Sequence, residues 1–122
     1  MLTEKSVDLY EAKDNEFIPS YLKIRSSSIS DQADCVFVVT GNGMAPLIKH
    51  DDYVMVAFTD ELVPGEIGVF ETDRGLAIRQ YYKEGLRSFR PELEQYHIGS
   101  RSEYKIVGRC LGVLLPEDIR NW

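Results

Sequence analysis

The sequence lacks long apolar runs and any excess of basic residues. It contains no stretch of roughly 18 consecutive apolar residues, and residues 1–20 show no basic region followed by an apolar core, so we predict neither a membrane span nor a signal peptide. We therefore expect a cytoplasmic protein. With 14 Lys and Arg against 20 Asp and Glu, the net charge is −6, which argues against an intrinsic nucleic-acid-binding surface.

Cysteine and histidine are also scarce. The two cysteines, Cys35 and Cys110, lie far apart, each among residues typical of strands, and neither belongs to a Cys-x-x-Cys pair. We expect buried thiols rather than a redox pair or a metal site, as in a reducing compartment. His50 and His97 have no Asp, Glu or Cys at ligand spacing and are interpreted as exposed loop residues, so no metal or cofactor is expected.

The chain does contain many short apolar runs separated by Gly and Pro turns. Together with the length of 122 residues, they predict a mainly β, compact and strongly twisted domain with one or two short helical turns. Residues 1–34 are interpreted as a lead-in and linker segment and residues 35–122 as the domain. Residues 7–10 and 17–24 are expected to be extended, the second at a sheet edge because of Pro19. The predicted strands are 36–41, 53–58, 67–71, 76–82, 86–90 and 104–115, and the helical turn is 44–48.

Residues 40–56 join two predicted strands through a turn of restricted chemistry. A Gly-Asn-Gly break ends the first strand, and Met-Ala-Pro-Leu-Ile follows as one expected helical turn. The stretch resembles the Gly-x-Ser-Met-x-Pro signature of the LexA/UmuD family of self-cleaving repressors and mutagenesis proteins. In that signature, Gly43 stands where the family has its nucleophilic serine. Four further residues stand at matching places: Gly41, Met44, Pro46 and Asp52.

The resemblance implies a dyad in which an uncharged, desolvated lysine activates the serine. The family's later pattern, a Gly-Asp turn and a hairpin leading into a Val-Lys-Arg strand, resembles residues 64–70 and 77–81 and places Arg79 at the lysine position. Arginine cannot act as this base, because its guanidinium stays protonated in proteins. Lys83 is the only lysine nearby, and its place beside a Glu-Gly turn makes it a poor candidate for a displaced base.

The resemblance also implies a loop within residues 1–34 that the domain cuts in itself, usually at an Ala-Gly or Cys-Gly bond. Neither dipeptide occurs in the chain, and Ala12-Lys13 is the nearest candidate. Weaker matches follow: residues 89–96 resemble the family's Leu-x-Pro-x-Asn-x-x-Tyr loop, and residues 104–113 resemble its closing strand. The resemblance therefore covers residues 36–115.

From this resemblance we expect the regulatory and dimerisation domain of a LexA-like or phage-repressor-like transcription regulator, of the kind that acts in the SOS response, with its self-cleavage lost. DNA would be contacted only through a separate upstream helix-turn-helix domain, and a regulatory protein is a possible partner. Two alternatives stay open. One is an active Ser-Lys peptidase domain inactivated by a Ser-to-Gly substitution at position 43, and the other is a stand-alone protein-interaction module.

The C-terminal region is predicted to form the dimer interface. Residues 104–115 are long and apolar and are expected to be an unpaired edge strand, which invites pairing with a second chain. Homodimers of the resembled family form through this region. We therefore expect a two-fold homodimer with these interface residues: Val107, Leu111, Val113, Leu115, Ile119 and Trp122.

Overall fold

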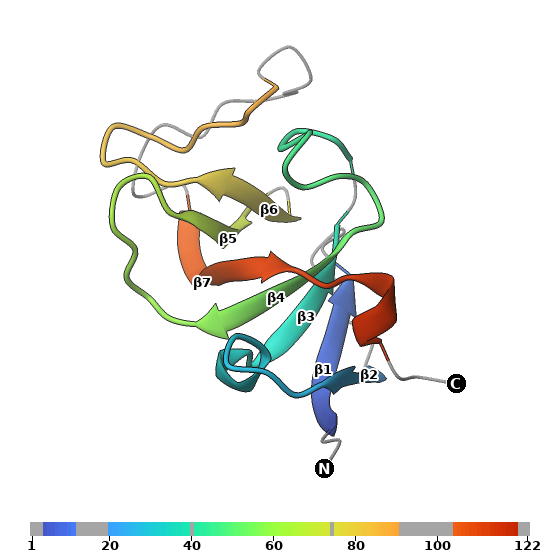
Figure 1. Ribbon diagram of the computed structural model, residues 1–122. Coiled ribbons are helices and arrows are strands. Elements are labelled where there is room, and N and C mark those ends of the chain that lie inside the picture. The colour runs from blue at the N-terminus through green and yellow to red at the C-terminus, as the bar shows by residue number, and fades with distance from the viewer. Residues whose placement is uncertain (1–3, 12–19, 40, 74, 91–103, 120–122) are drawn as a thin grey trace.

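Seven strands form one sheet in the computed structural model, which describes residues 4–11, 20–39, 41–73, 75–90 and 104–119 (Figure 1). The strand order is β2-β1-β3-β4-β7-β5-β6, and all neighbours are antiparallel except β1 and β3. Within these residues, the helical elements with assigned bounds are the short 3-10 turns η1 (Ser30–Gln32) and η4 (Pro116–Asp118). The predicted mainly β fold is confirmed. The strands are β1 (Glu4–Glu11), β2 (Ser20–Arg25), β3 (Cys35–Val38), β4 (Tyr53–Phe58), β5 (Ile67–Thr72), β6 (Gly75–Gln80) and β7 (Tyr104–Val113).

The pairing of β7 with both of its neighbours is interrupted by a register shift. The register shifts between Met55 and Val56 where β4 pairs with β7, and between Val69 and Phe70 where β5 pairs with β7. Such bulges bend a strand and increase its twist. In Figure 1, β5 and β6 lie on one side of β7, which pairs with β5 through residues 104–109, and β4 and β3 lie on its other side, where residues 108–113 pair with β4.

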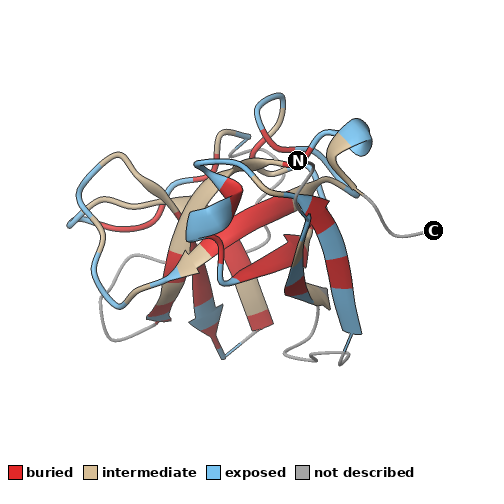
Figure 2. Cartoon of the chain, turned by 60° about the horizontal axis from the view of Figure 1, so that its bottom comes forward, coloured by how far each residue is buried: buried red, intermediate tan, exposed pale blue. Residues whose placement is uncertain are grey.

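The core lies on both faces of the central strands. On β3, Cys35 and Phe37 belong to one apolar cluster and Val36 belongs to another, and all three are nearly inaccessible to solvent. This strand is therefore buried on both faces. Figure 2 shows buried residues along the inner strands and exposed ones in the surrounding loops.

The first two strands are part of the same sheet as the rest of the domain. Val7 of β1 and Leu22 and Ile24 of β2 are buried in the second cluster. β2 lies at one edge, as predicted for residues 17–24, of which residues 17–19 lie outside the described part. The division of the chain at residue 34 stays a prediction.

Two expectations about strands are wrong. β7 is an inner strand, hydrogen-bonded to β4 on one side and to β5 on the other, and the edges of the sheet are β2 and β6. Residues 86–90 do not form a strand, because they meet β6 only at the Gln80–Arg87 bridge and then turn away. An apolar run marks a strand but does not show how many neighbours pair with it.

The segment after β7 packs against the outer edge of β2. Ile119 forms an antiparallel bridge with Ile24, and Asp118 forms an ion pair with Arg25 at 2.8 Å. The chain's own tail therefore covers part of an edge that would otherwise be open to another strand.

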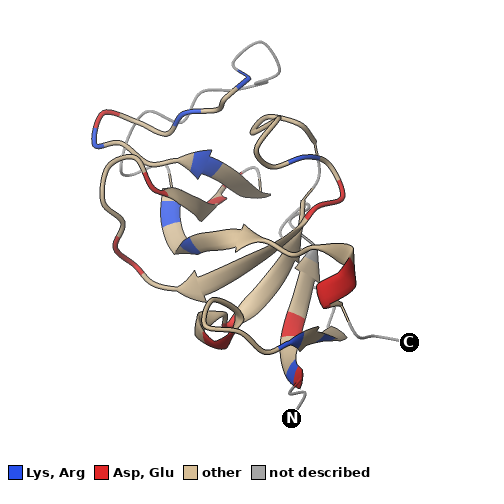
Figure 3. Ribbon diagram, in the orientation of Figure 1, with Lys and Arg blue, Asp and Glu red and all other residues tan. Residues whose placement is uncertain are grey.

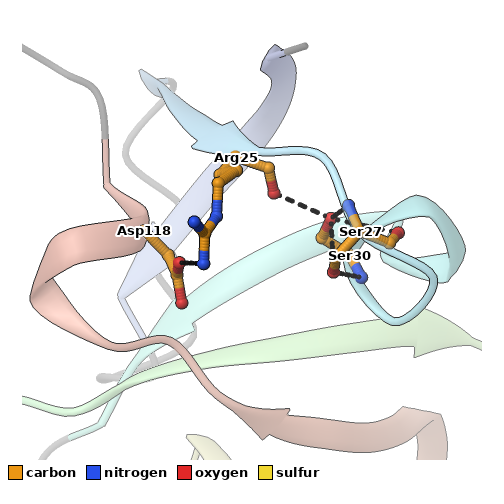
Figure 4. A network of polar contacts seen from close by, with 4 residues as sticks. All are labelled: Arg25, Ser27, Ser30 and Asp118. Carbon is orange, nitrogen blue, oxygen red and sulfur yellow. Dashed lines mark hydrogen bonds and ion pairs between the residues drawn. The ribbon is translucent and has the colours of Figure 1, made fainter. Parts of the chain in front are cut away.

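Beside this contact, hydroxyl groups fix the loop that leaves β2. Ser30 is almost completely buried, and its Oγ donates to the Arg25 carbonyl at 2.9 Å and accepts the Ser27 N–H at 2.7 Å (Figure 4). On the other side of η1, the Lys5 ammonium donates to the carbonyls of Ser30 and Ala33. These bonds satisfy main-chain groups at the start and end of a short turn.

Candidate functional site

The loop between β3 and β4 is a closed elbow, which we define as residues 41–52. The end of the elbow is hydrogen-bonded to Val39, which directly follows β3. The Val39 N–H donates to the Asp52 carbonyl at 2.9 Å, and the Val39 carbonyl accepts the Asp51 N–H at 2.8 Å. The Asp52 carboxylate also accepts the Lys49 N–H at 2.8 Å. The aspartate of the signature therefore contacts main-chain groups inside the loop.

Two apolar residues anchor the elbow to the core. The Ile48 N–H donates to the Met44 carbonyl at 3.0 Å, which closes the helical turn predicted at 44–48. Both side chains are at least 96% buried, in the same cluster as β3 and β4. Pro46, which follows a cis peptide bond, lies exposed at the outside of the turn.

His50 fastens the start of the elbow. Gly41 has a φ of 88°, which favours glycine, and its N–H donates to His50 Nδ1 at 2.8 Å. The His50 N–H donates to Asn42 Oδ1 at 3.1 Å, and His50 Nε2 lies 3.4 Å from Asp51 Oδ1. The histidine is exposed, as predicted, but it also has a structural contact that its sequence context did not indicate.

Gly43 and Arg79, the residues at the predicted serine and lysine positions, lie together. A Cβ atom placed on Gly43 would lie 3.9 Å from Arg79 Nη1, and this nitrogen also donates to the Ile78 carbonyl at 2.9 Å. The guanidinium thus faces the place of a side chain on residue 43. A hydroxyl oxygen extends one bond beyond Cβ, so the spacing suits a nucleophile and a base in hydrogen-bond reach.

Ser88 completes this site and was missed by sequence reasoning. Its Oγ donates to the Gly43 carbonyl at 2.5 Å, accepts the Arg90 N–H at 3.1 Å and would lie 3.2 Å from a Cβ on Gly43. The Arg90 N–H also donates to the Gly43 carbonyl, at 2.9 Å. Because the hydroxyl proton points at a carbonyl oxygen, which is not a base, Ser88 is not arranged as a displaced nucleophile.

Lys83 does not approach the elbow. It is exposed in a turn in which the Gly85 N–H donates to the Tyr82 carbonyl at 3.2 Å. Within the described part of the chain, Ser88 Oγ and Arg79 Nη1 are the only atoms outside the neighbouring residues that come within 4 Å of the Cβ position on Gly43. In this geometry, Lys83 cannot take a proton from a side chain at that position.

The predicted dimer residues lie mainly against the chain's own core. Val107 and Val113 pack on the first cluster, and Leu111 and Ile119 pack on the second. Leu115 is 55% exposed, and Trp122 lies outside the described residues. Of the predicted interface residues that are described, Leu115 is therefore the one whose surface is mostly open.

The two cysteines flank one residue of β4. Val56 pairs with Cys35 on one side and with Cys110 on the other. The Cα atoms of the two cysteines therefore lie two strand spacings apart, about 10 Å, and this Cα–Cα distance is too long for a disulfide. Both thiols are free. Burial, with smaller contributions from Asp34 and Asp8, raises the pKa of Cys35 to about 12, and burial raises the pKa of Cys110 to about 12. Cys35 is buried and Cys110 is half-buried, and the raised pKa keeps both thiols protonated near neutral pH.

Neither a cluster of metal-binding side chains nor a membrane-spanning helix occurs in the described ranges. No group of three or more His, Cys, Asp or Glu residues there could hold a metal ion. His97 lies outside these ranges. None of the helical elements in this part of the chain is long and apolar enough to cross a membrane.

Comparison with known protein families identifies the family of this chain. The family model described as Peptidase S24-like matches residues 9–111, which is most of the chain and includes the elbow, Arg79 and Ser88. No curated protein matches the chain. The resemblance to the LexA/UmuD family that the signature indicated is confirmed.

Proposed function

Because this chain belongs to the Peptidase S24-like family, we propose that it is the regulatory and dimerisation domain of a LexA-like or phage-repressor-like regulator that has lost self-cleavage. One observation carries the proposal. At the predicted nucleophile position Gly43 has no side chain, and the cation of Arg79 faces the vacant place. A guanidinium cannot accept a proton near neutral pH, and without a nucleophile there is no acyl-enzyme to form.

The retained role that we propose is to join two copies of the regulator. Domains of this family commonly dimerise. A dimer would bring together two upstream helix-turn-helix domains, each outside this chain, and so raise their effective concentration on paired half-sites in cytoplasmic DNA. We keep Leu115, Ile119 and Trp122 as proposed contacts of the tail. Pairing of a second chain along the whole of β7 is dropped, because residues 108–113 are paired with β4 and residues 104–109 with β5.

The experiment that tests the loss of cleavage is incubation of the full chain at about pH 10. Alkaline pH deprotonates a lysine base, so an active Ser-Lys domain cuts itself faster under these conditions. We expect the chain to stay uncut over hours. A discrete cut within residues 1–34, detected by mass spectrometry, would refute the proposal.

A second candidate function is an active self-cleaving peptidase inactivated only by the replacement of serine at position 43. The closeness of residues 43 and 79 supports it, because a Cβ on residue 43 would lie 3.9 Å from Arg79 Nη1. Two variants separate the candidates: Gly43→Ser alone, and Gly43→Ser with Arg79→Lys. If the single variant cleaves itself or a supplied peptide, the second candidate is correct. We expect turnover of the supplied peptide only from the double variant.

A stand-alone interaction module is the third candidate, and it shares the fold of the first. The two differ in what precedes residue 1 in the whole protein. A helix-turn-helix coding sequence immediately upstream supports the regulator, and its absence from the gene supports the module.

A further inference from the structure

The elbow begins with an Asn-Gly pair in which Asn42 is exposed. In such a pair the main-chain nitrogen of the glycine can attack the side-chain carbonyl carbon of the asparagine and close a succinimide ring, because the covalent structure already holds the two atoms close together. The other asparagines, Asn15 and Asn121, are followed by Glu and Trp. Asn42 is therefore the asparagine whose next residue has no side chain to cover the attacking nitrogen.

The main-chain nitrogen of Gly43 is available as a nucleophile. Within the described residues, the Gly43 N–H donates no hydrogen bond, whereas the Gly43 carbonyl accepts one from Ser88 Oγ and one from the Arg90 N–H. The nitrogen can therefore lose its proton without first breaking a hydrogen bond inside the protein. The contacts that hold Gly43 in place all involve its carbonyl and leave the nitrogen open.

The side-chain carbonyl of Asn42 is prepared for attack. Its Oδ1 accepts the His50 N–H at 3.1 Å, and attack on Cγ places negative charge on this oxygen. A main-chain N–H already in position stabilises such an oxyanion more than it stabilises the neutral carbonyl. The Asn42 main-chain carbonyl also accepts the Ala45 N–H at 3.1 Å, so the turn holds both carbonyl groups of the residue.

Charged side chains lie in the other half of the elbow. Residues 41–48 contain no charged residue, and the charges follow at Lys49, Asp51 and Asp52, close to the start of β4 (Figure 3). No carboxylate within residues 41–48 therefore opposes the negative charge that forms during the attack. A carboxylate created at position 42 would be the first charge in this half of the loop.

We propose that Asn42 is a site of spontaneous modification, in which the Gly43 nitrogen displaces the side-chain amide of Asn42. The Gly43 N–H gives its proton to hydroxide, the bond from the Gly43 nitrogen to Asn42 Cγ forms, and the Cγ–Nδ2 bond breaks. Ammonia leaves after Nδ2 takes a proton from water, which regenerates hydroxide. Water then opens the succinimide at either of its carbonyls and gives aspartate or isoaspartate at position 42.

The products change the elbow in charge and in main-chain path. Both products carry one more negative charge than the parent chain. In isoaspartate, the main chain runs through Cβ and Cγ of residue 42, so Gly41 and Gly43 are joined by a longer path while Ser88 and Arg90 still hold the Gly43 carbonyl. Position 43 thus has no side-chain nucleophile but presents a main-chain one. This inference goes beyond the proposed function, because the reaction leaves the chain uncut.

The experiment is incubation of the full chain, and of a synthetic peptide of residues 36–52, at mildly alkaline pH. Peptide mapping by mass spectrometry locates the exchange of NH for O, and enzymatic methylation of isoaspartate identifies the isomer. We expect Asn42 to be converted in the folded chain at least as fast as in the peptide, in which the His50 N–H is not held against Oδ1. Asn15 and Asn121 should stay unchanged, and the rate at Asn42 should rise with pH.

Two variants test the role of each reacting group. Gly43→Ala is expected to slow the conversion of Asn42 about tenfold or more, in the chain and in the peptide, because a Cβ hinders the close approach of the nitrogen. Asn42→Gln is the matched control. It keeps the side-chain amide but needs a larger ring, so residue 42 should keep its amide.

Each other result contradicts the inference. An unchanged Asn42 in the folded chain, together with conversion in the peptide, would show that the elbow protects the pair. Equal conversion of all three asparagines, or equal rates for the parent chain and Gly43→Ala, would show that neither the elbow nor the absence of a side chain directs the reaction. None of these results bears on the loss of self-cleavage, which is judged from cut chains.

Discussion

The side chain of Ser88 is hydrogen-bonded to the main chain of Gly43. The Ser88 hydroxyl donates to the Gly43 carbonyl at 2.5 Å. Ser88 Oγ would also lie 3.2 Å from a Cβ placed on residue 43. A side chain on residue 43 must therefore share space with the group that holds the residue in place.

Gly43→Ala is expected to lower the free energy of unfolding by about 1 kcal/mol, because Ser88 Oγ must shift by a few tenths of an ångström. Ser88→Ala should also cost about 1 kcal/mol through the lost hydrogen bonds. The double variant should cost less than the two single changes together. Urea unfolding of all four proteins gives the coupling, and strict additivity would show that the contact is unimportant.

Gly108→Ala is expected to destabilise the domain by about 3 kcal/mol, at the upper end for overpacking. Its Cβ would lie 2.5 Å from Val56 Cγ1 and 2.6 Å from the Ala57 carbonyl oxygen, and the second atom belongs to a paired strand that cannot move freely. Gly43→Ala is the matched control, since its Cβ meets only side-chain atoms. Equal melting temperatures for the two variants would contradict the inner position of β7.

The free energy of unfolding is expected to fall as the pH rises above about 9. Burial raises the pKa of Cys35 and Cys110 from the ordinary 9.0 to about 12, so between these values the unfolded chain releases protons that the native thiols keep. The two protonated thiols make their full contribution to the free energy of unfolding below about pH 9, and this contribution decreases as the pH rises toward 12. Urea unfolding at pH 8 and pH 10.5 under reducing conditions measures the loss.

The control for this pH dependence is Cys35→Ala with Cys110→Ala, in which the decrease between the two pH values should be smaller. As a second readout, a thiol reagent at pH 8 should react much more slowly with the native chain than with the urea-unfolded chain. Equal labelling rates would show that the thiols are accessible.

Ile119→Ala is expected to lower the free energy of unfolding by about 1–2 kcal/mol, because Ile119 packs against the second cluster and bridges the fully buried Ile24. Leu115→Ala is the control and should change stability little, since Leu115 is 55% exposed. Thermal unfolding below the concentration of association compares the two. The opposite order would mean that the tail leaves β2 in solution.

The elbow could be predicted from sequence because its residue types are restricted by local geometry. A positive φ at Gly41, a buried Met44 and a carboxylate contact at Asp52 all act within a dozen residues. Arg79 was found through a second local pattern. Ser88 could not be found, because its role depends on where the chain turns after a single bridge with β6.

The position of β7 could not be predicted for a related reason. The apolar run of residues 104–115 shows that the strand is buried but contains no information on which strands pair with it. Gly108 was the available sign, because the absence of a side chain there allows β4 to approach closely.

The atom that holds the elbow against Ser88 and Arg90 is the carbonyl oxygen of residue 43, which every amino acid has. An exchange between small residues at this codon therefore alters reactivity while the acceptor that fastens the loop remains, at the cost of a small shift of Ser88 Oγ. Descendants of one ancestral domain can gain or lose a nucleophile by a single codon change and still inherit the same scaffold. Selection for folding and selection for bond cleavage are thus separable at this position, so related chains with and without a side-chain hydroxyl here are expected to coexist.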